Sequence, residues 1–253
     1  MEVKKKILVI LKQVPGMKEK KDYQDTDVLN QSDKNLLMEA LNLGEDMGAE
    51  VDVMVHGPKS AENILREALT YGVHQAILVT NEKKQDYMVK DPGKAVALTA
   101  EEKGMYDLFF CGRQAVDGDS AHAAAVISGT LRIPLIPYAR KTWTEGKQIF
   151  AVCAGDEGDR QISCEMPAMV LSVREKGQNR YPTAAHIIRT YSGEYKVDVI
   201  KMKEDPEQNA GITQSRKYEI RQNKKEKNVM FSGKDAREAS EKMVKILKKW
   251  DVL

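Results

Sequence analysis

This sequence has little cysteine, no long apolar runs and almost no excess of charge of one sign. Its 253 residues include only three cysteines, an odd number without the spacing of metal ligands, which is typical of reduced thiols in a cytoplasmic protein. The formal net charge of +2 gives no overall field that would favour nucleic acid or a membrane surface as partner. No stretch approaches the roughly 20 apolar residues of a membrane span, so we expect no such span.

Three sequence motifs of well-known enzymes are also missing. No G-x-G-x-x-G follows the first apolar stretch, which excludes the ordinary dinucleotide fingerprint. There is no G-x-x-x-x-G-K-[ST] of a P-loop nucleotidase and no G-x-S-x-G of a hydrolase. His56 and His122 fall in loops that follow strands, but the spacing of carboxylate ligands for a metal site is absent.

Apolar strand-like segments alternate with amphipathic helical segments four times in the first 135 residues. The strands are expected at 7–11, 50–55, 75–80 and 106–110, and glycines follow three of the helical segments, at 48, 72 and 104. Ser32 or Asp33 is expected to cap the first helix, and Ser60 the second. This alternation predicts an α/β fold with a doubly wound, mostly parallel, Rossmann-like sheet.

The composition changes after Pro134. Shorter strands separated by glycine turns indicate a small strand-rich extension, and a short helix over 183–190 and a last strand over 196–200 follow it. The polar stretch 203–227 reads as an extended arm, after which Asp235 caps an amphipathic terminal helix. We therefore expect an α/β nucleotide-binding domain over residues 1–200. Residues 201–253 are expected to form an arm with a terminal helix, which makes contact with a partner subunit or packs on its own domain.

The most informative stretch is CGRQAVDGDSAH, residues 111–122, between the fourth strand and a helix rich in small residues. A strand, a polar loop with glycine and a helix start form anion sites in α/β proteins, because the first helical N–H groups lack partners. Asp117 and Asp119 are either an acid/base pair or groups that cap the helix and bind ligand hydroxyls. A capped loop without a ligand remains an alternative from the spacing alone.

Several ordered motifs together resemble one family. CGRQAVDGDSA, LKQVPG (11–16), LNQSDKNLLMEAL (29–41), REALTYGVHQAILV (66–79) and NRYPT (179–183) are similar to segments of the β subunit of electron transfer flavoproteins. The resemblance implies a heterodimer with an α subunit that carries a redox FAD and exchanges electrons with acyl-CoA dehydrogenases or related flavoenzymes. It also implies a second nucleotide in the β subunit and no independent enzyme activity.

The second nucleotide differs between branches of that family. Mitochondrial-type members hold a structural AMP, whereas electron-bifurcating members of anaerobes hold a second FAD. That FAD accepts hydride from NADH, and the electron pair is split between ferredoxin and the α-subunit flavin. The small loop with Gly118 between two aspartates resembles the FAD type, so we expect FAD, with AMP as the alternative.

The family's nucleotide contacts carry over by motif to four segments. They are Ile10, Leu11 and Lys12; Asn30, Gln31, Ser32 and Asp33; His56 and Gly57; and Arg113, Asp117, Gly118, Asp119, Ser120, Ala121, His122, Ala123 and Ala124. The family's partner-recognition loop corresponds to Glu175, Lys176, Gly177, Gln178 and Asn179.

This sequence departs from the family pattern at several of these positions. Gln31 replaces the usual proline and Gly16 the usual aspartate, and the recognition loop lacks its apolar anchor. Three other functions stay open: a simple electron carrier with AMP, a stand-alone adenine-nucleotide-binding regulator, and a nucleotide-dependent enzyme that acts alone.

Overall fold

The computed structural model describes residues 4–14, 28–81, 92–113, 121–173, 180–202 and 230–250. The chain divides into two compact units, residues 1–211 and 212–253. The expectations for Gly16, most of the loop at 111–122, the recognition loop and the arm at 203–227 lie outside the described residues.

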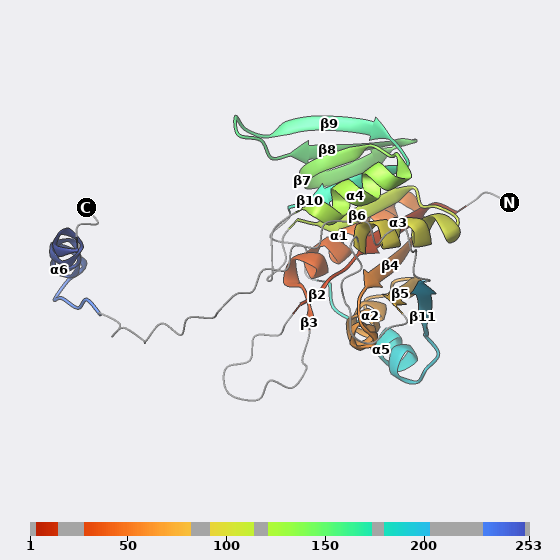
Figure 1. Cartoon of the computed structure of the whole chain (residues 1–253), viewed down its shortest axis with the longest axis horizontal. Coiled ribbons are helices and arrows are strands. Elements are labelled where there is room, and N and C mark those ends of the chain that lie inside the picture. The colour runs from red at the N-terminus through yellow and green to blue at the C-terminus, as the bar shows by residue number, and fades with distance from the viewer. Residues whose placement is uncertain are drawn as a thin grey trace. The chain divides into compact units, whose positions relative to one another are not determined.

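In the described part of the first unit, a nine-stranded sheet has the order β11-β5-β4-β1-β6-β10-β7-β8-β9, and Figure 1 shows it running from β11 at one edge to β9 at the other. Every neighbouring pair from β11 to β7 is parallel, whereas β7–β8 and β8–β9 are antiparallel. The doubly wound, mostly parallel sheet predicted from the sequence is thereby confirmed. The strands are β1 Lys6–Ile10, β4 Glu50–His56, β5 Gln75–Asn81, β6 Leu108–Gly112, β7 Leu135–Glu145, β8 Gln148–Cys153, β9 Arg160–Glu165, β10 Ala168–Ser172 and β11 Val197–Met202, and a separate ribbon joins β2 Gln13–Val14 to β3 Val28–Leu29.

Helices cover both faces of the parallel part of the sheet. The apolar side chains of α1 and α2 join those of Ile7, Val9 and Phe110 in one buried cluster. The side chains of α3 and α4 join Leu8 and Phe109 in a second cluster on the other face. Burial on both faces explains why the central strands read as continuous apolar runs. The helices are α1 Gln31–Met47, α2 Glu62–Leu69 (after the 3-10 turn η1 Lys59–Ala61), α3 Pro92–Glu102, α4 His122–Leu131 and α5 Ala184–Tyr191.

The first helix begins in a different way from the prediction. Its N-cap is Asn30, and the expectation that Ser32 or Asp33 caps the helix is wrong. Asp33 lies in the first turn, where its carboxylate accepts hydrogen bonds from Lys12 N–H and from the Asn30 side chain. Ser60 likewise lies in η1, and the cap of α2 is Ala61. Tertiary contacts therefore override local capping rules here.

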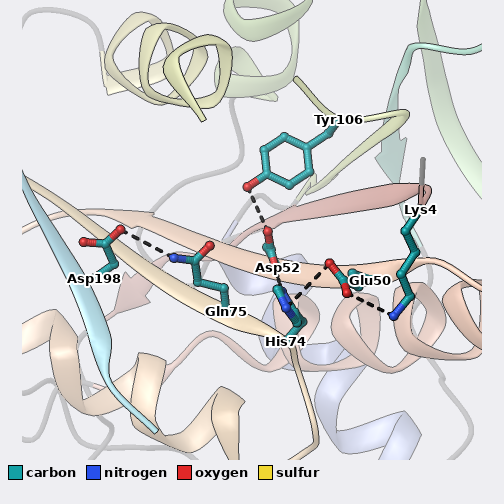
Figure 2. A network of polar contacts seen from close by, with 7 residues as sticks. All are labelled: Lys4, Glu50, Asp52, His74, Gln75, Tyr106 and Asp198. Atoms are coloured by element: carbon teal, nitrogen blue, oxygen red, sulfur yellow. Dashed lines mark hydrogen bonds and ion pairs between the residues drawn. The ribbon is translucent and has the colours of Figure 1, made fainter. Parts of the chain in front are cut away.

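A chain of polar contacts joins the amino-terminal ends of neighbouring strands (Figure 2). The Tyr106 hydroxyl donates to Oδ2 of the buried Asp52 (3.0 Å), whose Oδ1 lies 3.0 Å from Nδ1 of His74. Nε2 of His74 lies 3.5 Å from Glu50, which also pairs with Lys4 at 3.0 Å. These contacts tie together the starts of β4, β5 and β6.

The second unit contains helix α6, Ala236–Lys249. The Asp235 side chain accepts a hydrogen bond from Glu238 N–H (2.9 Å), which confirms Asp235 as its predicted cap. Apolar side chains on this helix, including Met243, Val244 and Trp250, are exposed. None of the helices among the described residues has the length and apolar character of a membrane span.

Candidate functional site

A cavity of about 280 Å³ lies at the carboxyl edge of the sheet, between β1 and β6. The chain leaves β1 through α1 on one face, whereas it reaches β6 through α3 on the other, so this is the point where the winding of the sheet reverses. Open α/β sheets bind ligands at such points. The cavity is lined by Ile10, Leu11, Lys12, Asp33, His56, Pro92, Gly93, Val96, Cys111, Gly112, Ala123 and Ile127.

Asp33 fixes the wall of the cavity where the chain leaves β1. Its Oδ2 accepts a hydrogen bond from Lys12 N–H (2.8 Å) and its Oδ1 one from the Asn30 amide (3.2 Å). Asn30 N–H in turn donates to the Lys12 carbonyl (3.2 Å). The exit of β1 and the start of α1 are therefore held together by charge-assisted bonds to a buried carboxylate.

His56 lines the cavity and carries a buried polar atom without a partner. Among the described residues, its Nε2 is a buried side-chain nitrogen that has no hydrogen-bond partner. Burial lowers the pKa of His56, so its imidazole is neutral near pH 7. An unsatisfied buried polar atom costs free energy, and a ligand that hydrogen-bonds to it recovers that cost. This nitrogen therefore suits a ligand with a complementary polar group.

Gly112 is required by packing against Asp33. A Cβ at this position would lie 2.4 Å from Oδ1 of Asp33, well inside van der Waals contact. Its close neighbour is thus the carboxylate that holds the Lys12 backbone. Its neighbour Cys111 also faces the cavity, and burial, with the nearby Asp33 carboxylate, raises the pKa of its thiol to about 12. This thiol is protonated near pH 7 and is not a nucleophile.

Helices α3 and α4 close the other side of the cavity. A Cβ on Gly93 would lie 3.0 Å from Val126 of α4, so the glycine allows the two helices to approach closely. Ala121, just before α4, has a left-handed backbone (φ 51°), and Ala123 faces the cavity. Pro92, Gly93, Val96 and Ile127 also line the cavity but were not predicted from the sequence. The Asp-Pro pair at 91–92 is a signal that could have found the first of them, because it predicts a helix start after the third strand, on the side of the sheet where ligands bind.

The structure gathers some of the residues carried over from the family and leaves others apart. Ile10, Leu11, Lys12, Asp33, His56 and Ala123 line the cavity. Asn30 is buried beside it, bonded to Asp33, whereas Gln31 and His122 are exposed and Ser32 and Gly57 are half-buried. Ala124 is buried against the sheet. Asp117, Gly118, Asp119, Ser120 and the segment 175–179 lie outside the described residues.

Arg113 directly follows Gly112, which lines the cavity. Its N–H donates to the Ser172 carbonyl (3.0 Å), and its guanidinium carbon lies 5.4 Å from the ring centre of Tyr138. Across the described part of the chain, no group of three or more His, Cys, Asp or Glu side chains is arranged to hold a metal ion. The described groups are thus suited to holding a ligand with polar and anionic parts.

Comparisons with known proteins converge on one family. The model of the electron transfer flavoprotein domain matches residues 22–206. The chain is 35% identical over 195 residues to the electron transfer flavoprotein subunit beta of Thermoanaerobacterium thermosaccharolyticum, covering 74% of this chain and 75% of that one. It is 32% identical over 200 residues to the subunit beta of Clostridium acetobutylicum, covering 76% and 77%. It is also 30% identical over 196 residues to the caffeyl-CoA reductase-Etf complex subunit CarD of Acetobacterium woodii, covering 74% and 75%.

Proposed function

Because the chain belongs to the electron transfer flavoprotein family, as a β subunit, we propose that it binds FAD in the cavity between β1 and β6. In this proposal it acts in a heterodimer with an α subunit and carries electrons to or from an acyl-CoA dehydrogenase-like flavoenzyme. NADH and ferredoxin are the further redox partners of the bifurcating version. The β subunit has no activity of its own.

The observation that carries the proposal is the buried Nε2 of His56 without a partner, beside a cavity at the reversal point of the sheet. The apolar walls from Ile10, Val96 and Ile127 suit the flat faces of a purine ring. The N–H groups at the start of α4 suit the phosphates. The residues present therefore fit a nucleotide.

FAD supplies the redox chemistry when bound, because it takes up electrons in pairs and passes them on singly. The protein's own residues bind and orient it. His56 offers a neutral imidazole nitrogen, Asp33 holds the Lys12 backbone in place, and the apolar side chains exclude water. The segment Asp117–Ser120, which lies outside the described residues, is proposed to complete the contacts to phosphate and ribose.

The partner enzyme is proposed from the relatives. CarD is named as a subunit of a caffeyl-CoA reductase-Etf complex, so we expect this chain to serve a flavoenzyme that acts on a CoA thioester. The segment 175–179 is proposed as the loop that recognises it. All three cysteines are free, in keeping with a cytoplasmic complex.

The size of the cavity favours a second candidate. At about 280 Å³ it is near the lower end for ligand pockets, which is closer to the needs of a mononucleotide than of a whole dinucleotide. A structural AMP is smaller than FAD and therefore suits a cavity of this volume better. In that case the heterodimer is a simple electron carrier.

The nucleotide content of the purified complex tests both candidates. The chain is produced with its α subunit, the complex is denatured, and FAD and AMP are counted per heterodimer by chromatography. Two FAD and no AMP support the bifurcating flavoprotein. One FAD and one AMP support the simple carrier. No complex and no flavin would overturn both and leave a stand-alone nucleotide-binding protein.

A further inference from the structure

Tyr138 has an unusual backbone for its residue type. It lies in β7 with φ at 51°, in the left-handed region that tyrosine rarely adopts. The pairing of β7 is irregular on both sides of it, because the register shifts between Val170 and Ser172 of β10 and between Ala139 and Lys141 of β7. Its carbonyl accepts a hydrogen bond from Ala154 N–H (3.0 Å). A glycine would adopt this conformation without strain, so the backbone alone gives no reason for a tyrosine.

The side chain of Tyr138 supplies a reason. Its ring is 40% exposed, and the guanidinium of Arg113 lies over it at 5.4 Å from the ring centre. Arg113 itself comes directly after Gly112, which lines the cavity, and its backbone is fixed to β10 by the bond to Ser172. A guanidinium that is stacked on a ring has fewer rotamers and presents its N–H groups edgewise.

We propose that Tyr138 is a positioning residue that orients the guanidinium of Arg113, the residue that follows Gly112 of the cavity wall, to bind the phosphate of the nucleotide. This inference rests on the proposed function, because it requires a nucleotide in the cavity. A planar guanidinium matches the oxygens of phosphate in bidentate fashion. Holding it in advance reduces the entropy that binding would otherwise cost. Among the described residues, the charged side chains that line the cavity are Lys12 and Asp33, and the Asp33 carboxylate is bonded to the Lys12 backbone and to Asn30.

The alternative is that Tyr138 only packs against its neighbours. Two substitutions separate these roles. Tyr138→Phe keeps the ring and therefore the contact with Arg113. Tyr138→Gly removes the ring but relieves the left-handed backbone, so it removes the contact without adding strain. Tyr191→Ala, which removes a 68%-exposed aromatic ring on α5, is the matched control.

The experiment compares a ligand with phosphate and one without. The full chain in complex with its α subunit is freed of nucleotide, and the affinities for ADP and adenosine are measured by calorimetry. We expect Tyr138→Gly to bind ADP up to about tenfold more weakly and adenosine within about twofold of wild type, because binding must then order the Arg113 side chain. Tyr138→Phe and Tyr191→Ala should bind both like wild type, and salt should weaken ADP binding less in Tyr138→Gly.

Other outcomes contradict the inference in distinguishable ways. Equal losses for ADP and adenosine in Tyr138→Gly, or no loss, would overturn the positioning role while leaving the nucleotide site in place. A loss in Tyr138→Phe as large as in Tyr138→Gly would also overturn it, because the ring is then not what positions Arg113. A wild-type complex that binds neither ligand would overturn the proposed function itself.

Discussion

At the scale of single residues, the cavity depends on how closely Gly112 approaches Asp33. The glycine ends β6, and the carboxylate beside it holds the exit of β1 and the start of α1. Three elements thus meet around one glycine and one aspartate. A side chain at Gly112 would push the Asp33 carboxylate away from Lys12 N–H, which donates a hydrogen bond to it.

Substitution of Gly112 by alanine should therefore be costly. The added Cβ would lie 2.4 Å from Oδ1 of Asp33. We expect a loss of about 1–3 kcal/mol in the free energy of unfolding, since the carboxylate must move and its bonds to Lys12 and Asn30 weaken. Chemical denaturation measures this change.

Gly129→Ala is the matched control. Gly129 is exposed on α4, and a Cβ there would have no atom within 4 Å. Since alanine favours helix more than glycine, we expect this variant to be more stable by about 0.5–1 kcal/mol. Equal effects of the two substitutions would contradict the packing argument at Gly112.

His56 should give the chain a dependence on pH. Burial lowers its pKa in the folded state, so the unfolded chain binds a proton more readily. Stability is therefore full above the unfolded value of about 6.5 and falls as the pH drops through the folded pKa. In this pH range the titration of His56 adds up to about 1.4 kcal/mol per pH unit to the slope of the free energy of unfolding against pH. We expect His56→Gln to lack this contribution when the nucleotide-free chain is denatured at several pH values. Identical slopes in both proteins would show that His56 does not titrate in this way.

The reasons for success and failure of the sequence analysis are visible at single residues too. Gly48 was predicted to end the first helix, and it does so in the left-handed conformation (φ 64°). The prediction that Asp33 caps the same helix failed, because its partner Lys12 comes from another segment of the chain. The unpaired nitrogen of His56 is likewise a property of burial, which spacing in the sequence does not report.

At the scale of elements, the polar chain of Figure 2 fixes three strands at the edge opposite the cavity. Asp52 is its centre, with 2% of its surface exposed and contacts to both Tyr106 and His74. Burial, with the nearby Asp52 carboxylate, raises the pKa of Tyr106, so its hydroxyl remains a donor. The desolvation penalty of a buried carboxylate is offset by partners such as these, whereas removing one partner destabilises the fold strongly because the charge is left uncompensated.

A double-mutant cycle on Asp52 and Tyr106 measures this contact. Asp52→Ala leaves the Tyr106 hydroxyl buried without its acceptor, at a cost of about 1–3 kcal/mol in the free energy of unfolding. With Tyr106→Phe added, that orphaned hydroxyl is gone. We expect the double variant to be less destabilised than the sum of the single ones by about 0.5–3 kcal/mol. Strict additivity would mean that the contact contributes nothing.

Glu50 should contribute stability only above acidic pH. The hydrogen bond from Lys4 is the main cause that lowers its pKa, with the charge of His74 adding to it. A lowered carboxyl pKa stabilises the fold above the unfolded value of about 4.3, and the gain disappears as the pH falls through the folded value. Glu50→Gln should therefore be less stable than wild type at pH 7, and the difference should shrink as the pH falls below about 4.3. A difference in the free energy of unfolding that does not shrink toward acid pH would point to packing instead of charge.

At the scale of the whole molecule, the alternation of strands and helices predicted the doubly wound sheet, and the ends of its strands predicted where the cavity lies. The order of the later strands did not follow from the sequence. β10 lies between β6 and β7, and β11 pairs with β5 at the far edge. These pairings join segments far apart in the chain, and local periodicity carries no information about them.

Nucleotide binding should stabilise the whole fold. A ligand that binds only the folded state adds about 2.7 kcal/mol to the free energy of unfolding when present at 100 times its dissociation constant. We expect added ADP to raise the melting temperature of the nucleotide-free complex. His56→Phe, which removes the unpaired nitrogen from the cavity, should reduce this rise. A rise of equal size in wild type and variant would mean that the ligand does not use His56.

The positions of the lining residues along the chain determine how early during synthesis the cavity can form. They extend from Ile10 to Ile127, and they come from both sides of a strand that is central to the sheet. β1 is synthesised first, and its two neighbours in the sheet are β4 and β6. β6 follows about a hundred residues later, so β1 can pair on both sides only after that segment has been made. Such distant pairing closes slowly compared with local structure. The cavity that we propose as the nucleotide site is therefore incomplete in a nascent chain until α4 has emerged, so a nucleotide would bind there only after the centre of the sheet has assembled.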